Sequence, residues 1–173
     1  MKKIVMGIAA LSLALFVAGC ASGPSAGMQD VQDARRSRPD NVLAGVASSE
    51  DKARSESQAR SQLTRALSSI AKNIASDYRS AGGAGADALE TEFIQAVARV
   101  QISGIETAKQ HQEKKVWWTV YYLNKSAAQS AIKSAEAAAK ANVPAAAAFN
   151  SDTYFEARFR EAAGREWAAS ASN

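Results

Sequence analysis

The feature that most constrains the fold is the segment KVWWTVYYL at residues 115–123, which consists mostly of β-branched and aromatic residues. That composition is typical of a β-strand. Successive side chains of a strand point to opposite faces of its sheet. The strand therefore has two rows: Val116, Trp118, Val120 and Tyr122 on one face, and Trp117, Thr119, Tyr121 and Leu123 on the other. Helices packed on one face cover one row only. We expect the second row to be exposed, covered by the C-terminal helix or buried against a partner.

Two more strands are predicted, at about residues 42–47 and 100–110. The first contains Gly45, a position that permits close approach by a large side chain. The second begins with an apolar pattern of period two, and Gly104 within it is a candidate bulge or close-contact site. Residues 110–113, which include His111, are interpreted as the turn that joins this strand to the aromatic one.

Four helices are predicted, and the first has the clearest pattern. It follows Ser48 and Asp51, which have the spacing of a capping box. Its apolar residues recur at steps of three and four, which places them on one face; they are Ala59, Leu63, Ala66, Leu67, Ile70, Ile74 and Tyr78. The opposite arc is polar and basic, with Lys52, Arg54, Gln58, Gln62, Arg65 and Lys72. We interpret this arc as a solvated face, because the N-terminal export signal described below leaves the chain little access to nucleic acid.

The three remaining helices follow in order. One starts at residues 87–90 after the glycine-rich turn at residues 81–85, and another, rich in alanine, runs from a capping-box sequence at residues 126–129 to about residue 142. The last spans about residues 153–168. Its apolar stripe consists of Phe155, Phe159, Ala162, Ala163 and Trp167.

The first twenty residues have the pattern of an export signal. Lys2 and Lys3 precede an apolar run at residues 4–17, which is shorter than the roughly 20 residues that a membrane-spanning helix needs. Residues 1–19 are thus interpreted as a signal peptide. The sequence VAGC at residues 17–20 resembles the lipobox of bacterial lipoproteins. This resemblance implies that Cys20 carries a covalent lipid, and Ala21 after it implies an outer-membrane protein facing the periplasm.

Residues 20–40 are predicted to be the lipidated N-terminus and a flexible tether, because they are rich in serine, glycine and polar residues and lack an apolar period. Three basic residues in this segment, Arg35, Arg36 and Arg38, have two interpretations. They lie near anionic lipid headgroups, where each charge contributes about 1 kcal/mol, or they form a solvated basic linker.

No catalytic or metal-binding set is evident. His111 is the sole histidine, so no second imidazole shares a metal with it. The carboxylates Glu90, Glu92, Glu106 and Glu113 are spread over different predicted elements without a spacing that requires acid–base chemistry. The net charge of +4 is too small to indicate nucleic acid without a clustered patch. We therefore predict a protein that is not an enzyme, with no cofactor other than the lipid on Cys20.

Over about residues 41–135 the chain resembles the Lpp-twenty family of bacterial lipoproteins. The resemblance is carried by AGVA at residues 44–47, by the alanine-spaced first helix, and by SGI at residues 103–105 followed by the aromatic strand. It implies an α+β domain at residues 41–142, with helices packed on a three-stranded antiparallel sheet. A C-terminal helical extension at residues 143–173 follows. Members of this family are membrane-associated, some of them with the flagellar apparatus, and no catalytic residues come with the resemblance.

These features together predict a non-catalytic, lipid-anchored envelope protein. Its domain binds another protein or a second copy of itself, with Trp117, Trp118, Tyr121 and Tyr122 as the candidate interaction surface. The alternative is a binding module for peptidoglycan or a small periplasmic ligand, in which Trp117 and Tyr121 are stacking platforms. A structural role in the flagellar apparatus is a third hypothesis, suggested by the family resemblance alone.

Overall fold

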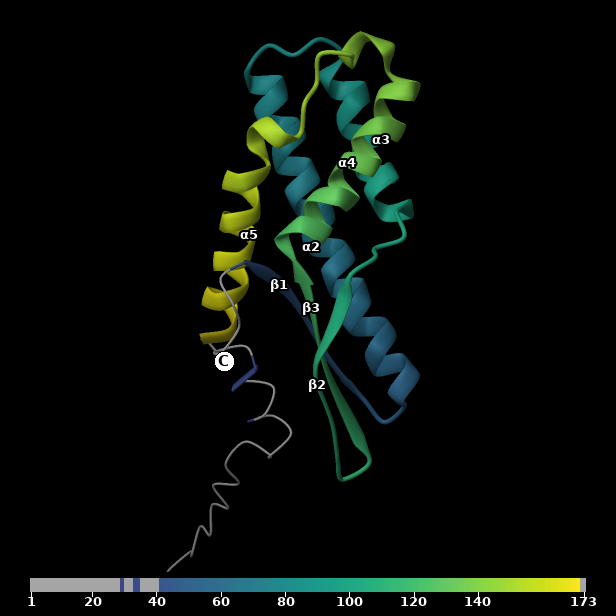
Figure 1. The fold of residues 1–173 in the computed structure, drawn as a ribbon, viewed down its shortest axis with the longest axis vertical. Coiled ribbons are helices and arrows are strands. Elements are labelled where there is room, and N and C mark those ends of the chain that lie inside the picture. The colour runs from purple at the N-terminus through teal and green to yellow at the C-terminus, as the bar shows by residue number, and fades with distance from the viewer. Residues whose placement is uncertain (1–28, 30–32, 35–40, 172–173) are drawn as a thin grey trace, which may run out of the picture.

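The computed structural model describes residues 29, 33–34 and 41–171, without the side chains of residues 165–171. Cys20, the signal peptide and the three tether arginines Arg35, Arg36 and Arg38 lie outside this part of the chain, as does the side chain of Trp167. The elements are β1 (Val42–Ser49), α2 (Lys52–Ser80), α3 (Ala86–Arg99), β2 (Ile105–Glu113), β3 (Val116–Asn124), α4 (Lys125–Asn142), the 3-10 turn η1 (Pro144–Ala146) and α5 (Asp152–Ala171) (Figure 1). The fold is α+β, as predicted.

The sheet is antiparallel and has the order β1-β3-β2, so the aromatic strand β3 is central. Its register places Val46 of β1 opposite Val120, and His111 of β2 opposite Trp118. The predicted turn at residues 110–113 was wrong, because these residues belong to β2. The turn is instead formed by Lys114 (φ 47°) and Lys115 (φ 71°). Two residues of positive φ make a tight hairpin whose twist matches that of the strands.

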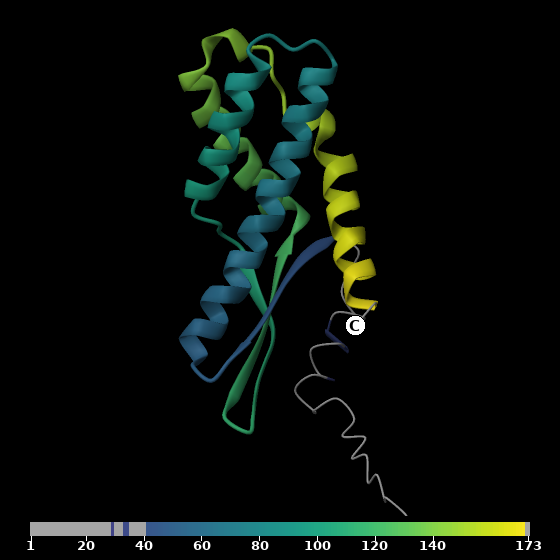
Figure 2. The same ribbon diagram turned by 180° about the vertical axis from the view of Figure 1, so that it is seen from behind.

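Helix α2 runs along one face of the sheet for almost the whole length of the molecule, with α3 and α5 on either side of it (Figure 2). The predicted apolar stripe is confirmed, since all its members are buried except the partly buried Ala66. Leu43 and Leu123 from the sheet belong to the same core as Leu63 and Leu67 of α2, and all four are fully buried. The core therefore lies between α2 and the sheet.

Residues after Asn142 complete the other end of this core. Phe149 is fully buried and makes edge-on ring contacts with Tyr78 of α2, at a centroid distance of 5.1 Å, and with Phe93 of α3, at 5.3 Å. Phe155 and Phe159 of α5 are 2% exposed and belong to the same cluster. The segment beyond residue 143 thus shares the core of residues 41–142.

Helix boundaries differ from the predicted capping boxes. The N-cap of α2 is Asp51, whose carboxylate accepts from the Arg54 amide at 2.7 Å, while Ser48 is paired within β1. The N-cap of α4 is Asn124 rather than Ser126, and its side chain accepts from the Ala127 amide at 2.8 Å. In both cases the strand before the helix is longer than predicted. Pairing between β1 and β3 continues to Ser49, the last residue of β1, and to Asn124, the last residue of β3.

The two glycines singled out in the sequence both lie at close contacts. Gly104 precedes β2 with φ +75°, and a Cβ there would meet the Ala127 Cβ at 3.0 Å, so it is a close-contact site. The bulge lies further on, between Thr107 and Lys109. Gly45 permits the close approach of α2: a Cβ at this position would meet the Ala59 carbonyl oxygen at 2.2 Å and the Leu63 Cγ at 3.0 Å.

Candidate functional site

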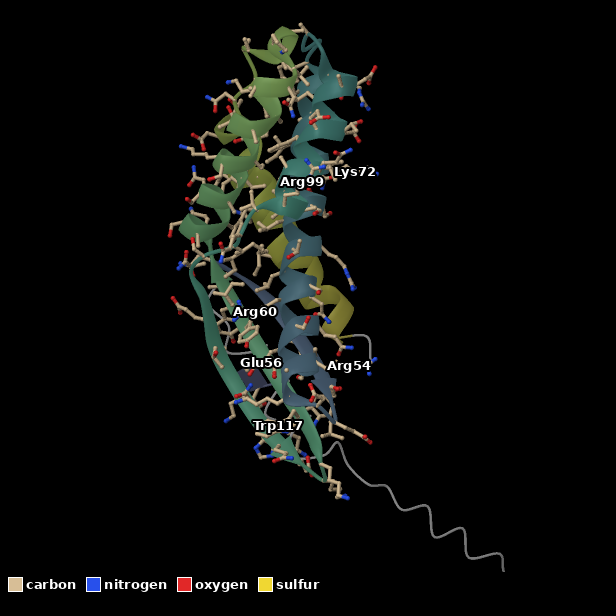
Figure 3. All side chains as sticks on the ribbon, turned by 90° about the vertical axis from the view of Figure 1, so that its right-hand side faces the viewer. Arg54, Glu56, Arg60, Lys72, Arg99 and Trp117 are labelled. Carbon is tan, nitrogen blue, oxygen red and sulfur yellow. The ribbon has the colours of Figure 1, made fainter. Side chains whose placement is uncertain are left out.

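The aromatic residues of β3 lie on both faces of the sheet and do not form one surface. Trp117 and Tyr121 face α2, where each ring is covered by a cation: Lys52 Nζ lies 5.4 Å from the Trp117 ring centroid, and the Arg60 guanidinium carbon lies 5.0 Å from that of Tyr121. Tyr121 is only 4% exposed. Figure 3 shows Arg60 and Trp117 on the side of α2 that faces the strands. This row belongs to the packing between α2 and the sheet.

A polar seam continues this contact toward the start of α2. The Ser55 hydroxyl donates to the Ala47 carbonyl at 3.1 Å and pairs with the Thr119 hydroxyl at 2.9 Å, and Ser55 and Thr119 are both fully buried. Gln110 Nε2 donates to Glu56 Oε1 at 2.9 Å. Because these groups satisfy one another, the seam fixes the position of α2 and leaves little for a ligand to bind.

The sequence contained a partial signal for this arrangement. Lys52, Glu56 and Arg60 recur every four residues, which places them along one side of α2. They were grouped with the solvated arc or left unassigned, because their contact with Trp117 and Tyr121 depends on the register between helix and strand. Periodicity alone does not give that register.

The outer face of the sheet carries the other aromatic row and is the candidate site. Here Val46 (9% exposed) and Val120 (0%) form a small second cluster. Trp118, Tyr122, Ala108 and Ala34 are packed against it and partly buried. Within the part of the chain that is described, α2 to α5 contribute no member of this cluster. We call this surface the outer sheet face.

One residue that precedes β1 contacts the outer sheet face. Ala34 packs against the cluster, and its carbonyl accepts a hydrogen bond from the Tyr122 hydroxyl. The rim is formed by the polar residues of β2 whose register partners are on this face, including His111 opposite Trp118 and Glu106 opposite Tyr122. An apolar, aromatic centre with a polar rim is the usual composition of a protein interface.

The carboxylates singled out in the sequence lie on two elements, Glu90 and Glu92 on α3 and Glu106 and Glu113 on β2. Two of the carboxylates singled out in the sequence have structural partners: Glu90 pairs with Arg79, and Glu92 accepts from Asn142 Nδ2 at 2.8 Å. No group of three His, Cys, Asp or Glu side chains capable of holding a metal occurs among the residues that the structure describes.

A cavity of about 250 Å³ between α3 and α4 was not anticipated from the sequence. Its lining consists of Glu92, Ala96, Arg99, Val100, Ala138 and Asn142. The hydrogen bond between Glu92 and Asn142 occupies two of its polar groups, and its volume is below the usual range of roughly 300–1,000 Å³ for ligand sites. The outer sheet face remains the stronger candidate.

Ion pairs connect α5 to α4 and α2. Lys133 lies 2.7 Å from Asp152 and, together with a hydrogen bond from Gln129, lowers the pKa of that carboxyl. Lys125 similarly lowers the pKa of Glu156. Arg158 Nε donates to Asp77 of α2 at 2.7 Å, which raises the pKa of the guanidinium. These pairs link secondary-structure elements and are structural.

Comparison of the chain with known protein families, curated proteins and solved structures gives no match. Among the helices of the described residues, none is sufficiently long and apolar to span a membrane.

Proposed function

We propose that this chain is a non-catalytic, lipid-anchored protein of the bacterial cell envelope, and that its outer sheet face binds another protein or a second copy of the chain. The observation that carries the proposal is the position of Trp118 and Tyr122. They pack against the buried Val46 and Val120 on a face to which α2 to α5 contribute no residue. Large aromatic residues at the apolar centre of a surface are the typical anchors of protein interfaces.

The anchoring part of the proposal rests on the N-terminal sequence. The charged start, the short apolar run and the lipobox-like residues 17–20 support lipid attachment at Cys20, and Ala21 supports the outer membrane, facing the periplasm. Kinship with the Lpp-twenty lipoproteins is part of the same proposal, and the quoted segments support it. Two or more acyl chains anchor a protein stably, whereas one chain is marginal.

Binding of peptidoglycan or a small ligand through Trp117 and Tyr121 has less support. Arg60 covers Tyr121, which is almost fully buried, and Lys52 covers Trp117. A sugar or peptide stacking on these rings must first displace both cations. The protein-binding alternative requires no such rearrangement of α2.

Site-specific photocrosslinking in cells tests the interaction surface. A benzophenone amino acid replaces Trp118, and in a control chain it replaces Ala157, an exposed residue of α5. We expect a discrete crosslinked product from position 118 and none from position 157. Equal products from the two positions, or none from position 118, would exclude the outer sheet face as the interface.

The anchor is tested separately with globomycin, which blocks lipoprotein signal peptidase, and with Cys20→Ala. Each is expected to leave an unprocessed or unanchored chain. If processing and membrane fractionation stay unchanged in both, the chain is not a lipoprotein, whatever the crosslinking result.

A further inference from the structure

Most cations on the described helices have an acidic partner, but four on α2 do not. One of the four, Arg60, covers the Tyr121 ring. Lys125, Lys133 and Arg160 lie within 3.2 Å of a carboxylate of α5. The exposed side chains of Arg54, Arg65 and Lys72, in contrast, form no ion pair with any acidic residue of the described chain. We call these three residues the α2 stripe.

The α2 stripe is straight and points away from the core. Each residue of an α-helix is rotated by about 100° about the helix axis from the one before it and lies about 1.5 Å further along the axis. Arg65 comes 11 positions after Arg54, and Lys72 comes 7 positions after Arg65. At these spacings the three side chains leave the helix axis in directions that agree to within about 20°, and the distance along the axis from Arg54 to Lys72 is about 27 Å. Leu63, nine positions after Arg54, is on the opposite side and fully buried. In Figure 3, Arg54 and Lys72 are on the side of α2 away from the strands.

Acidic side chains of α2 are directed elsewhere. Glu56 accepts from Gln110 and pairs with Lys52 on the sheet side, and Asp77 pairs with Arg158 of α5. The residues of the same outward face between the three cations are uncharged: Gln58, Ser61, Ser68 and Ser69. Positive charge along this face is therefore not neutralised by the helix that carries it.

We propose that the α2 stripe lies against an anionic lipid surface. A protein partner would normally need an apolar centre to bind, and the α2 stripe has neither aromatic nor large aliphatic residues. Attraction between basic side chains and anionic headgroups needs no such centre. Figure 2 shows that no other helix lies in front of α2, which is on the side of the sheet opposite to the outer sheet face. In this orientation Trp118 and Tyr122 point away from the lipid and remain accessible to a partner.

Vesicle binding by the unlipidated chain tests this contact independently of the anchor at Cys20. The chain from residue 21 onward lacks the predicted signal peptide and the cysteine, and it retains every described element. Its partition is measured on phosphatidylcholine vesicles with and without phosphatidylglycerol. We expect binding only to the anionic vesicles, weakening as salt shortens the screening length.

The decisive variant is Arg54→Gln/Arg65→Gln/Lys72→Gln. Each basic residue contributes about 1 kcal/mol to binding, which is about a fivefold change in the partition coefficient. Loss of all three should therefore lower the partition coefficient roughly 100-fold. The matched control, Lys125→Gln/Lys133→Gln/Arg160→Gln, removes the same charge from α4 and α5 and should bind like the original chain. Circular dichroism establishes that both variants are folded.

Three outcomes would overturn the proposal. The first is equal weakening by both triple variants, which would mean that net charge rather than the α2 stripe governs binding. The second is no difference between anionic and neutral vesicles. The third is binding to polyglutamate without binding to anionic vesicles, which would assign the α2 stripe to an acidic protein.

Discussion

Gly45 of β1 lies directly against the backbone of Ala59 of α2. A Cβ at position 45 would fall 2.2 Å from the Ala59 carbonyl oxygen and 3.0 Å from the Leu63 Cγ. The closest atom is main chain in the middle of a long helix, so it does not move aside as the end of a flexible side chain would. Hydrogen at this position allows α2 to approach the sheet closely enough to bury Leu63 and Leu67.

Gly45→Ala should therefore destabilise the protein by about 2 kcal/mol or more, because overpacking of a tight core costs about 1–3 kcal/mol. Gly164→Ala is the matched control. Gly164 lies inside α5, and a Cβ at this position would have no atom of the described residues within 4 Å, so alanine should stabilise the helix by about 1 kcal/mol. Urea unfolding of both variants measures the difference. Similar stability changes in the two would contradict the close packing at Gly45.

The polar seam predicts a second position-dependent effect. Ser55→Ala leaves the Thr119 hydroxyl and the Ala47 carbonyl without their buried partner, which should cost about 1–2 kcal/mol of unfolding free energy. Ser57→Ala, two residues along the same helix but exposed, should change stability by no more than about 0.5 kcal/mol. Chemical denaturation of both variants checks this, and a neutral Ser55→Ala would show that the seam contributes nothing.

Substitutions in the hairpin turn should stabilise the protein, because Lys114 and Lys115 both have positive φ, which residues other than glycine and asparagine rarely adopt. Lys114→Asn/Lys115→Gly supplies the two residues that this turn type favours, and should raise stability by about 1 kcal/mol. Lys114→Gln/Lys115→Gln removes the same two charges without relieving the backbone. Thermal unfolding should separate the two variants. A rise in both would attribute the effect to charge and not to φ.

Acid pH should weaken the link between α4 and α5. Asp152 has a pKa below its ordinary value of 3.8 in the folded chain, so its ionisation favours folding above that pH. This contribution is lost as the pH falls through the folded-state pKa. Asp152→Asn should cost less than about 1 kcal/mol at neutral pH, because the pair is partly exposed. Unfolding curves of the original chain and the variant should converge well below pH 3.8; a constant gap at all pH values would rule out this linkage.

Much of the architecture was predictable because burial leaves a periodic pattern in the sequence. The stripe from Ala59 to Tyr78 and the two rows of β3 were identified from periodicity alone. Polar segments carry no such pattern. Residues 110–113 looked like a turn because they are hydrophilic, yet they pair with β3, whose apolar side chains supply the burial. The covering of Tyr121 by Arg60 depends on how helix and strand align, and no local signal encodes that alignment.

The central claim, a lipid-anchored envelope protein, is tested most directly by the intact mass of the chain purified from membranes. The predicted mass is that of residues 20–173 with lipid attached to Cys20. A chain that still begins at Met1, or one in which Cys20 carries a free thiol, would contradict the account.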